Sequence, residues 1–332
     1  MREEAYFYPP RPKTGYANPY CLHFKEALAL KYEVAESDNR PVKGQLLSLL
    51  CHAFRSDVYF LNWIENVGVG RKRMLRTWIT LLCLTVMRWR RTRMVWILHN
   101  IHPHEGENES TKSIKRWLFR HADLIIAHSQ EAEEYARSHT SRKVLFVHHP
   151  VTPIRLKNDA TLEKDSPSDV FIWGSIHPYK GVGEFVSLPR LQECGLRVKI
   201  VGRCQNPDLA KQIASCCGER ITFENRMASF EEIAFHIKAS RYVLFPYIDS
   251  GFSSSGALID TLMLGGTPLA PSMGAFKDLA AEGVCITYRT EDELIDILNG
   301  GTTQRIDQDK VKTFIENNSW ENFIEKIHDN LK

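Results

Sequence analysis

The fold of this chain is decided by residues 243–270, which read VLFPY (243–247), IDSGFSSSG (248–256), ALIDTLMLGG (257–266) and TPLA (267–270). The apolar run is typical of a buried parallel strand. The Gly- and Ser-rich stretch after it predicts a turn whose last residues cap a helix, and Gly265-Gly266 would end that helix. A small-residue loop that opens a helix presents unpaired N–H groups and a positive dipole end, which favour phosphate. A simple strand–helix turn fits the same letters, because glycine serves both purposes.

Strands and helices alternate on both sides of this segment, as parallel βαβ units require. A polar stretch with two prolines interrupts the alternation and indicates a linker. We therefore expect an α/β protein with two doubly wound, Rossmann-like domains facing a central cleft, where strand ends place ligands. The expected parts are a first domain at 1–152, a linker at 153–169, a second domain at 170–307, and C-terminal helices at 308–332 that pack back towards the first domain.

Charge is spread unevenly along the 332 residues. Residues 1–150 carry 23 Lys and Arg against 15 Asp and Glu, so this half is expected to face something anionic. The eight cysteines include one adjacent pair, Cys216-Cys217, and no C-x-x-C pair. They are expected to be reduced thiols of a cytoplasmic protein.

The second half carries FIWGSIHPYKGV (171–182), KIVGR (199–203), ITFEN (221–225) and then the segment quoted first. In this order and spacing they resemble the C-terminal half of GT-B-fold glycosyltransferases, most nearly family 4 and related bacterial polysaccharide-assembly transferases. Gly174, Lys180-Gly181, Asp260, Gly265 and the late Trp320 match the pattern of that family. The chain departs from it at Ser175, where an arginine is common, and at Phe252, where the first of two acidic residues is expected.

The resemblance implies a metal-independent hexosyltransferase that uses a nucleotide-diphosphate sugar and no cofactor. Its donor-binding residues would be Gly15, Gly174, Lys180, Arg203, Asn225, Ser254, Ser255, Gly256, Ala257 and Asp260. Lys180 and Arg203 would supply charge to the leaving diphosphate, and Asp260 would accept a hydrogen bond from a ribose hydroxyl. The alternatives are a solvated loop lysine, an exposed arginine and a helix-surface carboxylate.

A histidine-rich loop, HNIHPHE (99–105), follows a predicted strand at 94–99. A carboxylate next to imidazole is a suitable general base for an acceptor hydroxyl, so Glu105 is the first catalytic candidate, with His104 and His99 behind it. Three histidines in six residues also suggest a metal site, but no acid–histidine pair recurs elsewhere at ligand spacing. The histidines could also merely cap a loop.

Residues 71–93, RKRMLRTWITLLCLTVMRWRRTR, carry eight basic residues and no acid. Arginines and tryptophans at both ends of an apolar middle favour contact with an anionic membrane surface. The expected contacts are Arg73, Trp78, Arg88, Trp89, Arg90 and Arg91. Lys115, Arg116, Trp117 and Arg120 of the next helix are expected to extend this basic face. A nucleic-acid patch, or a core helix with charged ends, are the alternatives.

The sequence thus predicts a cytoplasmic glycosyltransferase, peripheral on the inner face of the cell membrane, with a lipid-linked saccharide as acceptor and no nucleic-acid partner. Its role would be in capsule or exopolysaccharide assembly. Two rivals stay open. One is a nucleotide-sugar epimerase of the same fold, and the other is a catalytically inactive nucleotide-sugar-binding partner of another transferase.

Overall fold

The computed structural model describes residues 2–10, 18–35, 45–70, 72–101, 108–156, 167–249, 254–300 and 305–332. The chain divides into two compact units. The N-terminal unit contains Met1–Pro150 and Asn318–Lys332, and the C-terminal unit contains Val151–Ser250 and Ser255–Asn317. Each unit holds one six-stranded sheet in which every pairing is parallel. The α/β architecture expected from the alternation is confirmed.

In the N-terminal unit the sheet order is β2-β1-β3-β4-β5-β6. The strands are β1 (Glu4–Tyr8), β2 (Glu33–Val34), β3 (Val58–Asn62), β4 (Arg93–Leu98), β5 (Leu124–Ala127) and β6 (Lys143–Phe146). The helices are α1 (Pro19–Leu28), α2 (Gln45–His52), the 3-10 helix η1 (Ile64–Gly68), α3 (Arg73–Trp89), α4 (Glu109–His121), α5 (Gln130–His139) and α14 (Trp320–Leu331).

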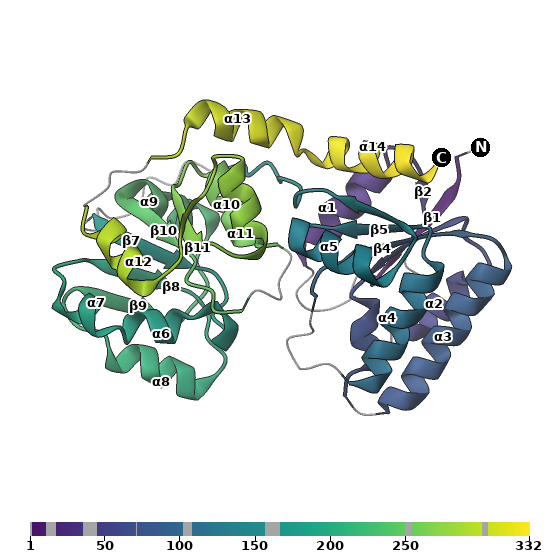
Figure 1. Ribbon diagram of the computed structural model, residues 1–332, viewed down its shortest axis with the longest axis horizontal. Helices are drawn as coiled ribbons and strands as arrows, with labels where there is room; N and C mark the ends of the chain where they lie inside the picture. The colour runs from purple at the N-terminus through teal and green to yellow at the C-terminus, as the bar shows by residue number, and fades with distance from the viewer. Residues whose placement is uncertain are drawn as a thin grey trace. The chain divides into compact units, whose positions relative to one another are not determined.

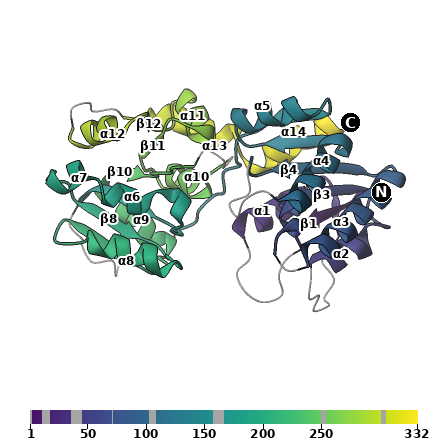
Figure 2. The same cartoon turned by 60° about the horizontal axis from the view of Figure 1, so that its bottom comes forward.

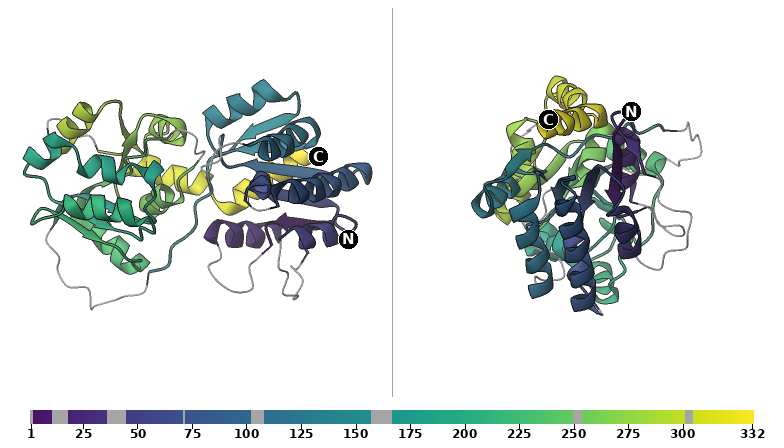
Figure 3. Two further views of the ribbon diagram at one scale, coloured as in Figure 1. Left: turned by 90° about the horizontal axis from the view of Figure 1, so that it is seen from below. Right: turned by 90° about the vertical axis from the view of Figure 1, so that its right-hand side faces the viewer.

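Successive strand residues of this sheet enter two different cores, because side chains alternate across a strand. Tyr6 and Tyr8 pack with residues of α2, α3 and α4, which lie side by side in Figure 1. Ala5 and Phe7 pack on the other face with residues of α1 and α14. The yellow C-terminal helix α14 accordingly lies beside the purple α1 in Figure 3.

In the C-terminal unit the sheet order is β12-β11-β10-β7-β8-β9. The strands are β7 (Ser168–Trp173), β8 (Val198–Val201), β9 (Ile221–Glu224), β10 (Ser240–Leu244), β11 (Pro268–Pro271) and β12 (Ile286–Tyr288). The helices are η2 (Pro178–Lys180), α6 (Val182–Val186), α7 (Pro189–Glu193), α8 (Pro207–Ser215), α9 (Phe230–Ala239), α10 (Gly256–Met263), α11 (Gly274–Ala281), α12 (Glu291–Leu298) and α13 (Gln308–Asn317). Figure 2 shows α6 and α8 near β8, and α11 and α12 near β11 and β12.

The sequence pattern predicts one helix at 183–194 and a strand at 57–63, and both predictions were wrong in part. The segment 183–194 forms two short helices instead of one, because Pro189 has no N–H to donate and begins a new helix as its first residue. Trp63 was expected to end a strand, but it takes a left-handed conformation with φ of 49° and precedes η1.

Candidate functional site

The C-terminal sheet changes direction between β7 and β10. From β7 the chain proceeds outwards through β8 and β9, and then returns to β10 on the other side of β7. Ligands of open α/β sheets bind at such a switch point, beyond the carboxyl ends of the strands. A small cavity opens here between the ends of β7 and β10, and its lining includes Trp173, Lys180 and Tyr247.

Two glycines let the backbone close around this switch point. Gly181 has φ of +65°, and a Cβ on it would lie 2.0 Å from the carbonyl oxygen of Pro246. A Cβ on Gly202 would lie 2.0 Å from the carbonyl oxygen of Gly174, itself at φ of +95°. Only glycine allows these approaches, so the loops after β7, β8 and β10 are held in direct contact.

Lys180 is the last residue of η2 and is half-buried. Its Nζ lies 5.6 Å from the centroid of the Tyr247 ring, within cation–π range. Burial lowers the pKa of this ammonium from its ordinary value. Within the described ranges it forms no ion pair with a carboxylate, so its charge is available to an anionic ligand.

The first turn of α10 lies next to this lysine's aromatic partner. Ser255 is the N-cap of α10: its side chain accepts from the N–H of Leu258, and its Oγ lies 3.3 Å from the hydroxyl of Tyr247. Among the described residues, space is open around Gly256, where an added Cβ would meet no atom within 4 Å. The N–H groups of Gly256 and Ala257 belong to the first turn, which has no intrahelical acceptors for them, whereas Ser254 precedes the cap. This turn can therefore receive an anion.

The helix is fastened to the sheet by Trp173, whose Nε1 donates to Thr261 Oγ1 over 3.0 Å. Asp260, the residue before Thr261, is half-buried, and burial raises its pKa to about 7. Its carboxyl makes no hydrogen bond or ion pair with any side chain that the structure describes. A carboxyl in this setting is able to accept from a ligand hydroxyl.

Arg203 and Asn225 differ in what they can offer. Arg203 is exposed, and no partner for its guanidinium occurs among the described residues. Asn225 bonds both ways to the backbone of Cys204: its Oδ1 accepts from the N–H over 2.8 Å and its Nδ2 donates to the carbonyl over 3.2 Å. The amide of Asn225 is thus occupied in joining two loops, and its backbone is the part that can meet a ligand.

The switch point of the N-terminal sheet lies between β1 and β3. Asn62 Nδ2 donates to the Tyr8 carbonyl over 3.1 Å, so its Oδ1 accepts from His99 Nε2 over 2.9 Å. His99 is 6% exposed and stacks on Trp63 with ring centroids 3.9 Å apart. Burial holds its pKa well below the ordinary value. Gly15, His104 and Glu105 lie outside the described residues.

A cluster of further rings surrounds His99 and was missed from the sequence. Tyr20 contacts His99, His128 and His149 with centroids 5.0 to 5.9 Å apart. Its hydroxyl donates to His128 Nε2, because the Nδ1–H of His128 is used by the carbonyl of Val147. The available signal was that His128 directly follows the apolar run LIIA (124–127), much as His99 ends the predicted strand at 94–99. Among the described residues, no group of three or more His, Cys, Asp or Glu could hold a metal ion.

Lys115 was expected on the basic face, and this prediction is wrong because its side chain points inwards. Lys115 is 2% exposed, and its Nζ donates to the carbonyl of Ile101 over 2.6 Å. Burial raises the pKa of the Glu65 carboxyl, and the positive charge of Lys115 acts in the opposite direction. Lys115 therefore belongs to the interior of the N-terminal unit and not to a basic surface.

The outer face of α3 is apolar. Met74, Leu75, Trp78, Leu82 and Trp89 are all exposed, Trp78 at 71% and Trp89 at 82%. These side chains form one stripe along the helix, since most are spaced by three, four or seven residues. Figure 1 shows α3 at the edge of the N-terminal unit. No helix in the described part of the chain is long and apolar enough to cross a membrane.

The arginines of α3 do different things. Arg73 and Arg91 are exposed, and Arg88 lies 3.7 Å from a carboxylate oxygen of Asp123. Arg90 donates to the carbonyls of Ala53 and Ser56 over 3.1 and 3.4 Å. Arg90 thus holds α2 and the following loop as well as bordering the apolar stripe.

No family model matches the chain. Two proteins of Xanthomonas campestris pv. campestris, both named GDP-mannose:glycolipid 4-beta-D-mannosyltransferase, are 26% identical to it, and each alignment covers 82% of this chain and 76% of the relative. Among solved structures, sucrose-phosphate synthase from Thermosynechococcus elongatus superposes with a TM-score of 0.69 at 15% identity, over 99% of this chain and 98% of the other. The Anabaena protein HepE in complex with UDP-glucose gives the same TM-score and identity, over 99% of both chains.

The two six-stranded parallel sheets, each with a switch point, and the likeness to these structures define the GT-B fold. The sequence similarity to the two named mannosyltransferases indicates glycosyl transfer as the activity. The chain is a glycosyltransferase of the GT-B fold, similar to those of family 4.

Proposed function

We propose that this chain transfers a hexosyl group from a nucleoside-diphosphate sugar to a lipid-linked saccharide, without a metal ion or cofactor, in the assembly of a surface polysaccharide such as capsule or exopolysaccharide. The names of the relatives specify GDP-mannose as donor and a glycolipid as acceptor, and one structural neighbour holds UDP-glucose. The observation that carries the proposal is the half-buried Lys180, which forms no ion pair with a carboxylate of the described residues and lies by Tyr247, whose hydroxyl reaches the cap of α10.

The chemistry follows from charge. As the sugar leaves, negative charge grows on the diphosphate, and groups already aimed at it lower the barrier. Lys180 and the first N–H groups of α10 would stabilise that charge, with Arg203 adding a second cation. Asp260 would accept from a ribose hydroxyl when it is ionised. In this proposal Lys180 supplies the cation, and no metal ion takes part in the step.

On the acceptor side, Glu105 remains the proposed general base, with His104 and His99 behind it. His99 is the weaker candidate for a physical reason. Its Nε2–H is used by Asn62, and burial disfavours the imidazolium that would form on taking a proton.

We further propose that α3 lies against the anionic inner face of the cell membrane. The exposed stripe from Leu75 to Trp89 is roughly 21 Å long at 1.5 Å per residue, and Trp78 and Trp89 suit the headgroup region. The exposed Arg73 and Arg91 border the stripe at its two ends and attract anionic headgroups. Such contact would bring the enzyme to a lipid-linked acceptor.

The test is a transfer assay with purified protein, a panel of GDP- and UDP-sugars and a lipid-linked saccharide, followed by detection of product. Transfer that requires both donor and acceptor is the expected result. Change of the donor sugar without acceptor would indicate an epimerase, and binding without any turnover would indicate an inactive partner. Either result would overturn the proposal.

A further inference from the structure

A second cavity of the C-terminal unit lies at the amino ends of β8 and β9. Its volume is about 290 Å³, close to the lower end of the range for pockets that hold small molecules. Its lining includes Leu196, which lies just before β8, and Arg220, which lies just before β9. The proposed donor site lies at the carboxyl ends of the strands of this sheet, so the two sites are separate.

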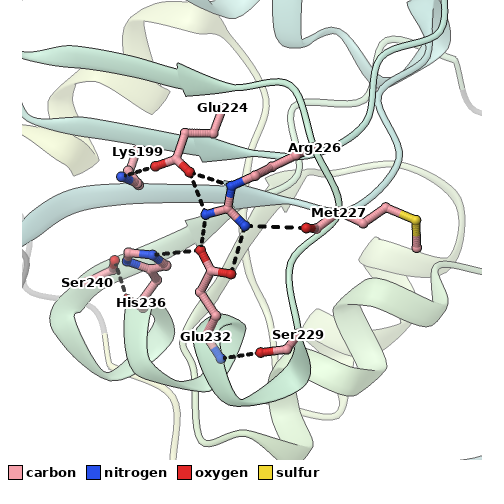
Figure 4. Close-up of polar contacts among 8 residues, drawn as sticks. All are labelled: Lys199, Glu224, Arg226, Met227, Ser229, Glu232, His236 and Ser240. Atoms are coloured by element: carbon pink, nitrogen blue, oxygen red, sulfur yellow. Dashed lines mark hydrogen bonds and ion pairs between the residues drawn. The ribbon is translucent and has the colours of Figure 1, made fainter. Parts of the chain in front are cut away.

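The arginines at the two ends of β9 differ in what they can bind. Beyond the carboxyl end, Arg226 donates to Glu224 over 2.8 Å and to Glu232 over 2.9 Å, as Figure 4 shows. At the amino end, Arg220 donates from Nη1 to the carbonyl of Cys194 over 3.0 Å. Its side chain is exposed, and no carboxylate in the described part of the chain pairs with it. Arg220 can therefore bind an anionic group in the cavity.

Three residues of the cavity lining are cysteines, and they come from the ends of two helices. Cys194 is the C-cap of α7, and Cys216 is the C-cap of α8 and precedes Cys217. All three are free and half-buried. The cavity thus brings thiols within reach of a small molecule that enters it.

The three sulfurs differ in their surroundings. Cys217 donates to the carbonyl of Ile213 over 3.3 Å, and burial raises the pKa of its thiol. The sulfur of Cys216 lies 3.7 Å from a serine hydroxyl. The sulfur of Cys194 accepts from the side-chain amide of Asn299 over 3.4 Å. An N–H donor beside the sulfur suits a thiolate, which is the form of cysteine that attacks disulfides. Cys194 is therefore the best placed of the three to react.

Side chains of both charges line the cavity together with this thiol. Arg220 supplies a cation, and the exposed Glu219 supplies an anion. Small thiols that contain cysteine carry the complementary groups, a carboxylate and an ammonium. We propose that the cavity is a modification site, in which Cys194 exchanges with the disulfide of such a zwitterionic thiol while Arg220 binds the carboxylate and Glu219 the ammonium.

The exchange is balanced without any further reactant. The thiol of Cys194 gives its proton to water, and the thiolate attacks one sulfur of the small disulfide. A new S–S bond forms to Cys194, the old S–S bond breaks, and the other half of the small disulfide leaves as a thiolate. The small disulfide is the oxidant, so an excess of a reducing thiol returns Cys194 to its free form.

The experiment follows the full chain by intact mass and peptide mapping during reaction with three disulfides. Oxidised glutathione carries both charges, cystamine carries only ammonium groups, and dithiodiglycolate carries only carboxylates. Cys51, an exposed thiol of α2, gives the rate without a binding site. We expect oxidised glutathione to modify Cys194 about tenfold faster than Cys51, since one charge-assisted hydrogen bond is worth roughly that factor. The other two disulfides should give a smaller ratio, and dithiothreitol should remove the modification.

Variants test the two charges separately. Arg220→Gln and Glu219→Gln should each lower the ratio for oxidised glutathione and leave the rate at Cys51 unchanged. Arg197→Gln, at an exposed arginine that does not line the cavity, is the matched control. If Arg220→Gln failed to fold, Glu219→Gln would carry the test, because its side chain is exposed. Equal rates at Cys194 and Cys51, the same ratio for all three disulfides, or reaction at another cysteine of the cavity would overturn the inference.

Discussion

The ammonium of Lys180 lies 5.6 Å from the centroid of the Tyr247 ring. The two residues come from loops after different strands, β7 and β10, which border the switch point of the C-terminal sheet. The ring faces the cation on one side and reaches Ser255, the cap of α10, with its hydroxyl. Tyr247 thus connects a cation to a helix N-terminus, and a diphosphate needs both kinds of group.

Gly181→Ala is expected to destabilise the protein by about 2 kcal/mol or more, because the new Cβ would collide with the Pro246 carbonyl at a left-handed φ. Urea unfolding measures this. Gly195→Ala is the control, since a Cβ there meets nothing within 4 Å and the backbone is not left-handed. Equal stability of the two variants would contradict the close approach of the loops.

Gly256→Leu, unlike Gly181→Ala, should leave stability unchanged and weaken nucleotide binding. Space is open at this position, so the fold should tolerate the side chain. The leucine would, however, stand at the first residue of α10, where the phosphates are proposed to bind. We expect normal thermal stability and at least a tenfold loss of nucleotide affinity, measured by calorimetry. Undiminished affinity would mean that this turn only connects a strand to a helix.

Asp260→Asn should stabilise the unliganded protein in a pH-dependent way. Burial raises the pKa of Asp260 in the native state to about 7 from its ordinary value of 3.8, so the native state holds more protons between these values and loses stability as the pH rises through them. Below pH 4 both states are protonated and the substitution has little effect. Above pH 7 the native state contains a half-buried carboxylate, and its removal should add roughly 2–4 kcal/mol to the free energy of unfolding.

Urea unfolding of wild type and Asp260→Asn at pH 5, 6, 7 and 8 provides the check. The difference between them should grow from pH 5 to pH 7 and level off towards pH 8. Glu193→Gln, at an exposed carboxylate of α7, should show no such growth. Parallel curves for Asp260→Asn and wild type would show that the Asp260 carboxyl is well solvated or paired.

Vesicle co-sedimentation tests the face of α3. Trp78→Ser with Leu82→Ser should reduce binding at every salt concentration, because both remove apolar area from the stripe. Arg73→Gln with Arg91→Gln should reduce binding to anionic vesicles at low salt only, since the Debye length falls to about 3 Å near 1 M. Equal binding of wild type to neutral and anionic vesicles would exclude electrostatic attraction by the arginines, and no binding to either would overturn the proposed membrane contact of α3.

Arg90 should be left intact in that experiment. It holds the carbonyls of Ala53 and Ser56, so Arg90→Gln is expected to lower the stability of the fold. A loss of vesicle binding in an Arg90 variant would then have two explanations. The exposed Arg73 and Arg91 do not have this disadvantage.

Much of the fold could be predicted because parallel strands and their helices leave local signals. The apolar run EAYFY predicts a strand at 4–8, which is β1, and the polar residues 317–319 predict a break between the last two helices, where α13 ends and α14 begins. The halves of the 183–194 segment could not be told apart by periodicity alone, although Pro189 was a sufficient signal. The left-handed conformation of Trp63, which precedes η1, had no such signal in the sequence.

The site was less predictable, because side-chain direction depends on tertiary contacts. Charge alone suggested a surface for Lys115, yet Thr111, Ile114 and Leu118 share its buried face at helical spacing, and this pattern was the better guide. The burial of His99 under Trp63, and its hydrogen bond to Asn62, depend on the pairing of β3 and β4, which are distant in sequence. Gly174 and Lys180, in contrast, lie at the strand end where the sequence pattern put them.

The most direct measurement is calorimetric titration of GDP and UDP into wild type, Lys180→Met and Lys211→Met, the last at an exposed lysine of α8. If Lys180 faces the diphosphate, its removal eliminates a charged hydrogen bond of about 1.5–3 kcal/mol. We predict that one nucleotide binds the wild type and Lys211→Met equally, and binds Lys180→Met about 10- to 100-fold more weakly, with thermal stability unchanged. Equal affinity in all three proteins would show that Lys180 does not bind the diphosphate.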